Sequence, residues 1–168
     1  MTQVIVGVMG PGETATPAVR ESAYDLGHRI AESGWLLLTG GRNVGVMDAA
    51  CRGAKSAGGL SIGILPGESA RGMSEFIDIP IFTGMGSARN QINVLSSQVI
   101  IACGMGPGTA SEIALAIKAK KPVILLHANS NSFQFFQALA GQITLADNPA
   151  QAIDQARQYI QKTFSDHG

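Results

Sequence analysis

Charged side chains are scarce in this chain, and those present balance in sign. Only 14% of the 168 residues are charged, with 12 basic and 12 acidic side chains. This composition argues against a nucleic-acid partner, because a phosphate backbone is bound by a clustered excess of Lys and Arg. A membrane is not expected either, because no apolar run approaches the roughly 20 residues of a span. The N-terminus lacks a basic segment with a small-residue cleavage site, and we expect a cytoplasmic protein.

Cysteine is almost absent, and so are the usual nucleotide fingerprints. Cys51 and Cys103 are too far apart for a zinc motif and lie in apolar segments, so we expect two buried thiols and no metal site. Residues 6–12 contain no G-x-G-x-x-G in the usual register, and no acidic residue closes the second strand. A P-loop is missing as well. We therefore expect neither a nicotinamide nor a flavin cofactor, and no P-loop hydrolase.

Short apolar runs alternate with helical segments along the chain. The expected strands are residues 4–9, 35–39, 60–65, 77–82, 98–102, 123–126 and 143–145, and the expected helices are residues 17–34, 46–57, 86–96, 113–120 and 133–139, with a last helix after Asn148 and Pro149. Unbroken apolar runs are typical of parallel strands buried on both faces. The sequence therefore predicts an α/β fold, a doubly wound, mainly parallel, Rossmann-like sheet of about seven strands with helices on both faces. No linker interrupts it, so residues 1–168 are expected to form one domain.

Glycine-rich loops are expected after the first, second and fifth strands. They lie at residues 10–12, 40–45 and 104–108. Ligands of doubly wound sheets sit at the carboxyl ends of the strands, where these three loops would converge. Glycine lets a backbone come close to a ligand, and the N–H groups that open a helix attract anions. We therefore expect a site for an anionic small molecule at this edge.

The segment from Cys103 to Glu112 is the most informative of these loops, because a strand, glycines and a helix start together form a phosphate cradle. Glu112 is expected in the first turn of the helix, either as an ordinary partner of the helix dipole or as a functional group beside the anion. Gly108 is expected to be the least tolerant of a side chain. Thr109 could cap the helix or donate its hydroxyl to the anion, and both roles stay open.

Four segments together resemble one superfamily. They are residues 39–50, 53–59, 85–90 and 104–112. The superfamily includes the Lonely Guy cytokinin-activating phosphoribohydrolases, proteins long mislabelled as lysine decarboxylases, and the molybdenum cofactor carrier proteins. The resemblance implies a Rossmann-like fold, a pocket for a phosphorylated ligand, and a homodimer or homotetramer. The helices expected at residues 87–96 and 111–120 carry few charges and are the expected interface.

The departures from the hydrolase pattern favour the carrier branch. That pattern is Pro-Gly-Gly-x-Gly-Thr-x-x-Glu, and the matching residues are Gly106, Gly108, Thr109 and Glu112. Gly104 stands in place of its proline, and Met105 in place of its first paired glycine. Ser111 replaces a second acid that the hydrolases commonly carry, and Asn90 replaces a lysine of their upstream Arg-Lys pair.

Arg89 and the second glycine loop supply further candidate contacts. Arg89 follows a glycine near a helix start, where its guanidinium could bind a phosphate, pair with Glu112 or face solvent. Arg42 and Asn43 could donate to an anion or to a pterin edge, or remain solvated.

The resemblance implies a binding protein more than an enzyme. We expect the chain to bind the molybdenum cofactor, a phosphorylated pterin, as cargo. The alternative is hydrolysis of nucleoside 5′-monophosphates to free base and ribose 5-phosphate, with Arg89 and Glu112 as catalytic residues. Met85 and Met105 lie in loops expected to face the ligand, although methionine more often fills a core. The full set of expected ligand-binding residues is Gly10, Gly12, Gly40, Gly41, Arg42, Asn43, Gly45, Met85, Arg89, Asn90, Gly104, Met105, Gly106, Gly108, Thr109 and Glu112.

Overall fold

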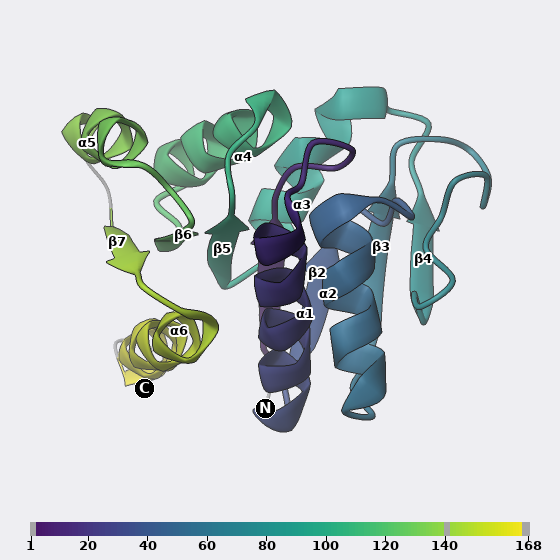
Figure 1. Cartoon of the computed structure of the whole chain (residues 1–168), viewed down its shortest axis with the longest axis horizontal. Coiled ribbons are helices and arrows are strands. Elements are labelled where there is room, and N and C mark those ends of the chain that lie inside the picture. Colours follow the sequence, from purple (N-terminus) through teal and green to yellow (C-terminus); the bar gives the residue numbers. More distant parts are fainter. Residues whose placement is uncertain (1–2, 140–141, 166–168) are drawn as a thin grey trace.

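The centre of the molecule is a parallel sheet of seven strands (Figure 1). The computed structural model describes residues 3–139 and 142–165. The strands are β1 (Ile5–Met9), β2 (Leu36–Thr39), β3 (Ser61–Leu65), β4 (Ile79–Phe82), β5 (Val99–Cys103), β6 (Val123–Leu126) and β7 (Ile143–Ala146). Their order across the sheet is β4-β3-β2-β1-β5-β6-β7, and every neighbouring pair is parallel. The chain therefore winds outward from β1 in two directions, as predicted for a doubly wound fold.

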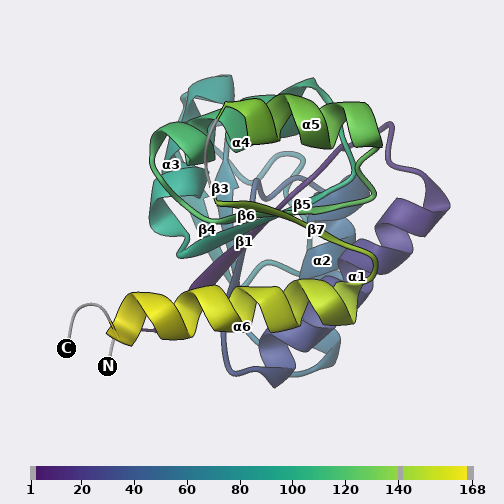
Figure 2. The ribbon, with the colours of Figure 1, turned by 90° about the vertical axis from the view of Figure 1, so that its left-hand side faces the viewer.

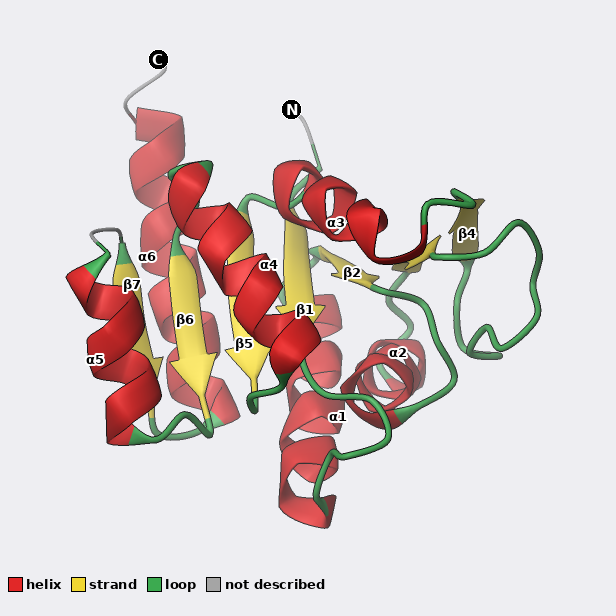
Figure 3. Ribbon diagram, turned by 90° about the horizontal axis from the view of Figure 1, so that it is seen from above, coloured by secondary structure: helices red, strands yellow, loops and turns green. Residues whose placement is uncertain are grey.

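Helices cover both faces of this sheet. They are α1 (Pro17–Glu32), α2 (Gly45–Ser56), the short 3₁₀ helix η1 (Gly86–Arg89), α3 (Asn90–Ser96), α4 (Pro107–Lys118), α5 (Ser130–Ala138) and α6 (Pro149–Ser165). Helices α1, α2 and α6 lie on one face, and α3, α4 and α5 lie on the other (Figures 2 and 3). The predicted Rossmann-like architecture is confirmed. None of the helices in the described part of the chain combines the length and apolar character needed to cross a bilayer.

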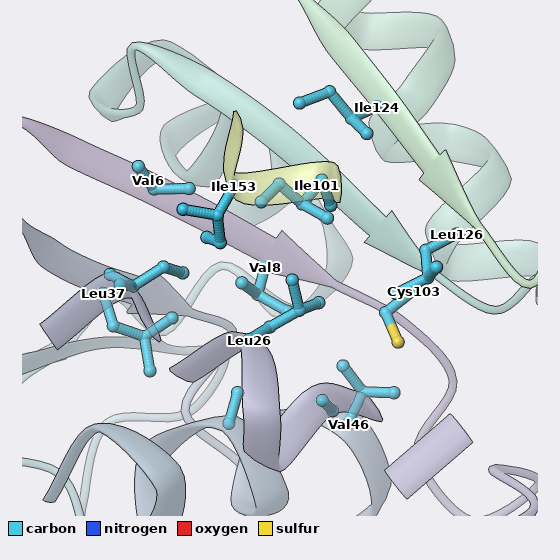
Figure 4. Packing of buried hydrophobic residues seen from close by; sticks show 14 of the residues in the cluster. Val6, Val8, Leu26, Leu37, Val46, Ile101, Cys103, Ile124, Leu126 and Ile153 are labelled. Carbon is cyan, nitrogen blue, oxygen red and sulfur yellow. The ribbon is translucent and has the colours of Figure 1, made fainter. Parts of the chain in front are cut away.

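Each face of the sheet has its own apolar core, because successive strand residues point in opposite directions. Val8 and Ile101 pack with Leu26 of α1 in the first core (Figure 4). Met9 and Ile100 belong to the second core. Burial on both sides explains why the inner strands β1, β2, β3, β5 and β6 read as apolar runs, whereas the edge strand β4 is exposed.

Both cysteines are free and buried, as predicted. Burial raises the pKa of the Cys51 thiol to about 11 and that of Cys103 to about 12. Both groups are therefore neutral thiols at physiological pH.

Local capping chemistry sets several helix ends. Thr16 Oγ1 accepts from Val19 N at 3.3 Å at the start of α1, with Pro17 in the first helical position. Asn148 Oδ1 accepts from Gln151 N at 2.9 Å before Pro149 opens α6. In both helices the side-chain oxygen satisfies an N–H group that a helix leaves unpaired.

Three helices begin or divide differently from the sequence prediction, and two of them lie near the candidate site; the third, α5, begins at Ser130 instead of residue 133. The helix predicted to begin at residue 113 begins at Pro107, because proline suits the first turn and Gly106 is the preceding cap. The helix predicted for residues 86–96 is divided into a 3₁₀ turn, which ends at Arg89, and the short α3. The differences at α4 and α3 concern residues around the candidate site.

Asp78 connects the edge strand β4 to the body of the sheet. Its carboxylate accepts from Lys55 Nζ at 2.5 Å and from Ser61 N at 2.9 Å. Burial raises the pKa of Asp78, but the hydrogen bonds from Lys55 and Ser61 outweigh it and hold the pKa below its usual range. The folded state therefore favours the ionised carboxylate.

We predict that Asp78→Asn lowers the free energy of unfolding by about 1–2 kcal/mol at pH 7, because a charged acceptor of three donor groups on Lys55 and Ser61 is lost. A pKa depressed by folding contributes stability that is present above the unfolded value and is lost as pH falls through the folded one. The difference between the variant and the unaltered protein should therefore shrink in acid, which urea unfolding at pH 7 and pH 3 measures. Asp25→Asn, which removes the exposed pair with Arg29, is the control and should change stability by less than about 0.5 kcal/mol.

Candidate functional site

A cavity of about 520 Å³ lies at the carboxyl ends of β1 and β2, where the loops after β1, β2 and β5 meet. Its lining residues are Val8, Met9, Gly10, Pro11, Gly12, Glu13, Thr14, Gly40, Arg42, Met47, Pro66, Gly86, Ser87, Arg89, Asn90, Gly106, Pro107, Gly108, Thr109 and Glu112. The volume is within the usual range for small-molecule pockets. The position agrees with the rule that doubly wound sheets bind ligands where the strand order reverses.

Two glycines let the loops around this cavity pack backbone against backbone. A Cβ atom on Gly10 would lie 2.4 Å from the Cys103 carbonyl oxygen at the end of β5. A Cβ atom on Gly45, which has a φ of +56°, would lie 2.1 Å from the Gly12 carbonyl oxygen. Any side chain at either position would therefore separate the loops that form the cavity wall.

Ten of the sixteen residues predicted to bind the ligand line this cavity. They are Gly10, Gly12, Gly40, Arg42, Arg89, Asn90, Gly106, Gly108, Thr109 and Glu112. Although these residues come from six loops or helices, the fold brings them together at one edge of the sheet.

Six predicted residues lie outside the lining. Asn43 and Gly45 border an adjacent groove of about 940 Å³ between α1 and α2. Gly41 packs against Leu65, and Gly104 against Val19 and Pro11. Met85 is 49% exposed, and Met105 packs against the second apolar core.

The start of α4 forms one wall of the cavity. The N–H groups of Gly108 and Thr109 have no intrahelical partner, and the cap residue, Gly106, has no side chain that could accept from them. Nothing in the protein lies within 4 Å of where a Cβ atom of Gly108 would stand, so its backbone is open to the cavity. An anion placed here would meet both the N–H groups and the positive end of the helix dipole.

The prediction that Glu112 lies in the first turn of its helix is wrong. Because α4 begins at Pro107, Glu112 is in the second turn, and the first turn contains no acidic residue. Its side chain is only 8% exposed, so it contributes a buried carboxylate to the cavity floor rather than a surface partner for the helix dipole.

Arg89 and Glu112 form a buried pair of charges on this floor. Arg89 Nη1 is 3.8 Å from Glu112 Oε1, too long for a hydrogen bond, and donates instead to Asn90 Oδ1 at 2.6 Å. Glu112 Oε1 accepts from Asn93 Nδ2 at 2.8 Å. Burial lowers the pKa of Arg89 and raises that of Glu112, and their mutual attraction offsets each shift only in part. Both charges therefore remain incompletely compensated by the protein.

Three buried side-chain atoms in the described part of the chain have no hydrogen-bond partner. They are Arg89 Nε, Asn93 Oδ1 and Thr109 Oγ1. Arg89 and Thr109 line the cavity, and Asn93 binds Glu112, which also lines it. Since buried polar atoms are almost always paired, their concentration at one cavity indicates a site that a polar ligand completes.

Thr109 is the third residue of α4, and its hydroxyl makes no capping bond. The capping role that the sequence left open for Thr109 is therefore absent, and its buried hydroxyl has no partner among the described residues.

The sequence did not indicate several residues of the site. Glu13 pairs with Arg42 at 2.6 Å at the exposed rim, and Met9 and Met47 contribute apolar wall. Asn93 is fully buried behind Glu112. The proximity of Glu13 to the first glycine loop was the one usable signal, because the other contacts depend on how helices pack.

A family model described as the SLOG cluster4 family matches residues 3–153, and the chain belongs to this family. The molybdenum cofactor binding protein of the phototrophic bacterium Rippkaea orientalis is 53% identical, with a TM-score of 0.93 over 95% of this chain and 99% of that one. The molybdenum cofactor carrier protein of Chlamydomonas reinhardtii is 51% identical, with a TM-score of 0.91 over 95% and 99% of the two chains. A protein of Archaeoglobus fulgidus, described as uncharacterised, is 48% identical over 121 residues, which are 72% of this chain and 78% of its own length. The resemblance inferred from motifs is confirmed.

We predict that Thr109→Val separates stability from binding. The free energy of unfolding should be unchanged or slightly raised, because the lost hydroxyl has no partner in the protein and the shape of the side chain is kept. Affinity for a phosphorylated ligand should fall by about 1–2 kcal/mol, the scale of one hydrogen bond to a charged group. Thermal unfolding and calorimetry measure the two quantities, and Thr109→Ser should restore binding. Loss of stability without loss of affinity would show that the hydroxyl is structural.

Proposed function

We propose that this member of the SLOG cluster4 family binds the molybdenum cofactor as cargo and acts as a carrier rather than as an enzyme. The observation that supports this most directly is the identity of 51–53%, over nearly the full chain, to two proteins whose names state that they bind or carry this cofactor. The cofactor is cargo in this proposal, a phosphorylated pterin that enters and leaves the cavity.

In this proposal the start of α4 holds the phosphate of the cofactor. The open backbone at Gly108, the N–H groups of the first turn and the hydroxyl of Thr109 are the donors, and Arg89 supplies positive charge at the floor. Met9, Met47 and Pro11 provide apolar wall for a ring system. The cavity is polar at the start of α4 and apolar at Met9, Pro11 and Met47. This asymmetry suits a molecule with one phosphate group and one fused ring system.

Two hydrogen-bonded side chains support a carrier over a phosphoribohydrolase. Ser111, at the position of the hydrolases' second acid, donates to the Gly108 carbonyl oxygen at 2.7 Å. Asn90, at the position of their lysine, donates to Ser111 Oγ at 3.0 Å and accepts from Arg89. Both residues thus join α4 to the turn that carries Arg89, and neither offers an ionisable group for proton transfer.

We predict that the protein, purified from a host that makes the cofactor, contains molybdenum and pterin in roughly equal molar amounts with the chain. Gly108→Val should abolish this cargo and leave the fold intact, because Gly108 lines the cavity and a Cβ atom there meets no protein atom within 4 Å. Metal analysis and pterin fluorescence measure the cargo, and circular dichroism checks the fold. Gly67→Val is the matched control, since a Cβ atom there also meets nothing within 4 Å and Gly67 lies outside the lining.

Two outcomes would contradict the carrier. One is release of free base from a nucleoside monophosphate, lost in Glu112→Ala. The other is equal cargo in the Gly108→Val and unaltered proteins.

The carrier is also proposed to be a homodimer or homotetramer that assembles through α3 and α4. Leu95 of α3 is 54% exposed, which supports this face as an apolar contact between copies. Light scattering at micromolar concentration should give a mass that is two or four times 17.4 kDa. Leu95→Glu should lower the measured mass toward that of a single chain. Leu145→Glu, on the edge strand β7 and away from α3, should leave the mass unchanged. A single-chain mass for the unaltered protein would contradict the proposal.

A further inference from the structure

Asn93 is a fully buried polar residue behind the cavity rather than in its lining. It lies on α3, and its amide donates to Glu112 Oε1 at 2.8 Å, with Met9 Sδ more distant at 3.9 Å. Its own carbonyl oxygen, Oδ1, has no partner. An apolar residue of similar size at this position would give a more stable fold, because an unpaired buried carbonyl group lowers the free energy of unfolding.

Glu112 has one oxygen engaged by the protein and one that is not. Oε1 accepts from Asn93, whereas no residue in the described part of the chain donates a hydrogen bond to Oε2. Arg89, the charged side chain that acts on this carboxylate, is 3.8 Å away and hydrogen-bonds elsewhere. Since Glu112 borders the cavity, its second oxygen is an acceptor for whatever enters.

We propose that Asn93 is a positioning residue that holds the Glu112 carboxylate ionised and turned to accept one N–H or O–H donor of the bound phosphomonoester. The inference rests on the proposed function and names the second contact by which the cavity selects its cargo. An amide donor stabilises the charged form of a carboxylate and leaves its negative charge in place. An arginine at hydrogen-bond distance would instead neutralise that charge.

The geometry of α4 relates this contact to the phosphate. Gly108 and Glu112 are four residues apart, so they lie on one face of the helix, about 6 Å apart along its axis. The site therefore favours phosphomonoesters that carry a donor roughly one helical turn from the phosphate. Inorganic phosphate fills only the first of these two contacts.

The experiment compares two probes, molybdopterin under anaerobic conditions and inorganic phosphate, by calorimetry from pH 5 to pH 8. Asn93→Leu should weaken molybdopterin binding by about 10- to 100-fold and change phosphate binding less than twofold. For the unaltered protein, the ratio of molybdopterin affinity to phosphate affinity should fall as the pH is lowered. The fall should be about tenfold for each pH unit below the pKa of Glu112. Asn93→Leu should move the midpoint of that fall to higher pH, because burial then acts on Glu112 without the amide.

Two further variants keep the test decisive. Glu112→Gln should weaken molybdopterin binding and remove the pH dependence of the ratio, because a neutral amide cannot be protonated in this range. Val94→Ala, a fully buried neighbour on α3, should lower stability without moving the midpoint. If Asn93→Leu weakens both probes equally, or leaves the midpoint in place, Asn93 is structural and the inference is overturned. If the unaltered protein binds phosphate but not molybdopterin, the proposed function fails, and this inference fails with it.

Discussion

The cavity depends on direct contact between the backbones of its loops. Gly10 at the end of β1 lies against the Cys103 carbonyl oxygen, and Gly45 at the start of α2 lies against the Gly12 carbonyl oxygen. Val46 N donates to the Pro11 carbonyl oxygen at 3.1 Å, which closes the same contact. Because no side chain separates these segments, the three loops share one geometry, and the walls of the cavity are fixed before any ligand arrives. Gly10 and Gly45, which the sequence suggested as ligand contacts, therefore also allow the loops to pack closely against one another.

The second constraint is the burial of opposite charges beneath those loops. Arg89 and Glu112 are held close, yet the protein completes the hydrogen bonding of neither. Such an arrangement costs folding free energy that an apolar floor would save, which is typical of a site kept for binding. The cost is tolerable because two apolar cores, one on each face of the sheet, stabilise the rest of the domain.

Much of the fold could be predicted from the sequence, because parallel strands, helix caps and glycine loops have local signatures. Asn148 and Pro149 signalled the start of α6 through side-chain chemistry within four residues. The convergence of the glycine loops followed from the strand–helix alternation. The predicted start of α4 was wrong: because the helix begins at Pro107, Glu112 lies buried in its second turn and not in its first. Asn93 gave no signal, because its position behind Glu112 is produced by the packing of α3 on α4, which no local pattern encodes.

The neutral thiols have a consequence for a protein that holds a metal-bearing molecule. Thiolate is the form of cysteine that competes for soft metals, and the chain has two cysteines, both buried and with pKa values far above neutrality. As neutral thiols, neither cysteine competes with the sulfur ligands of the metal in a bound cofactor. Neither cysteine lines the cavity, so the two thiols are kept apart from any metal that a bound molecule carries.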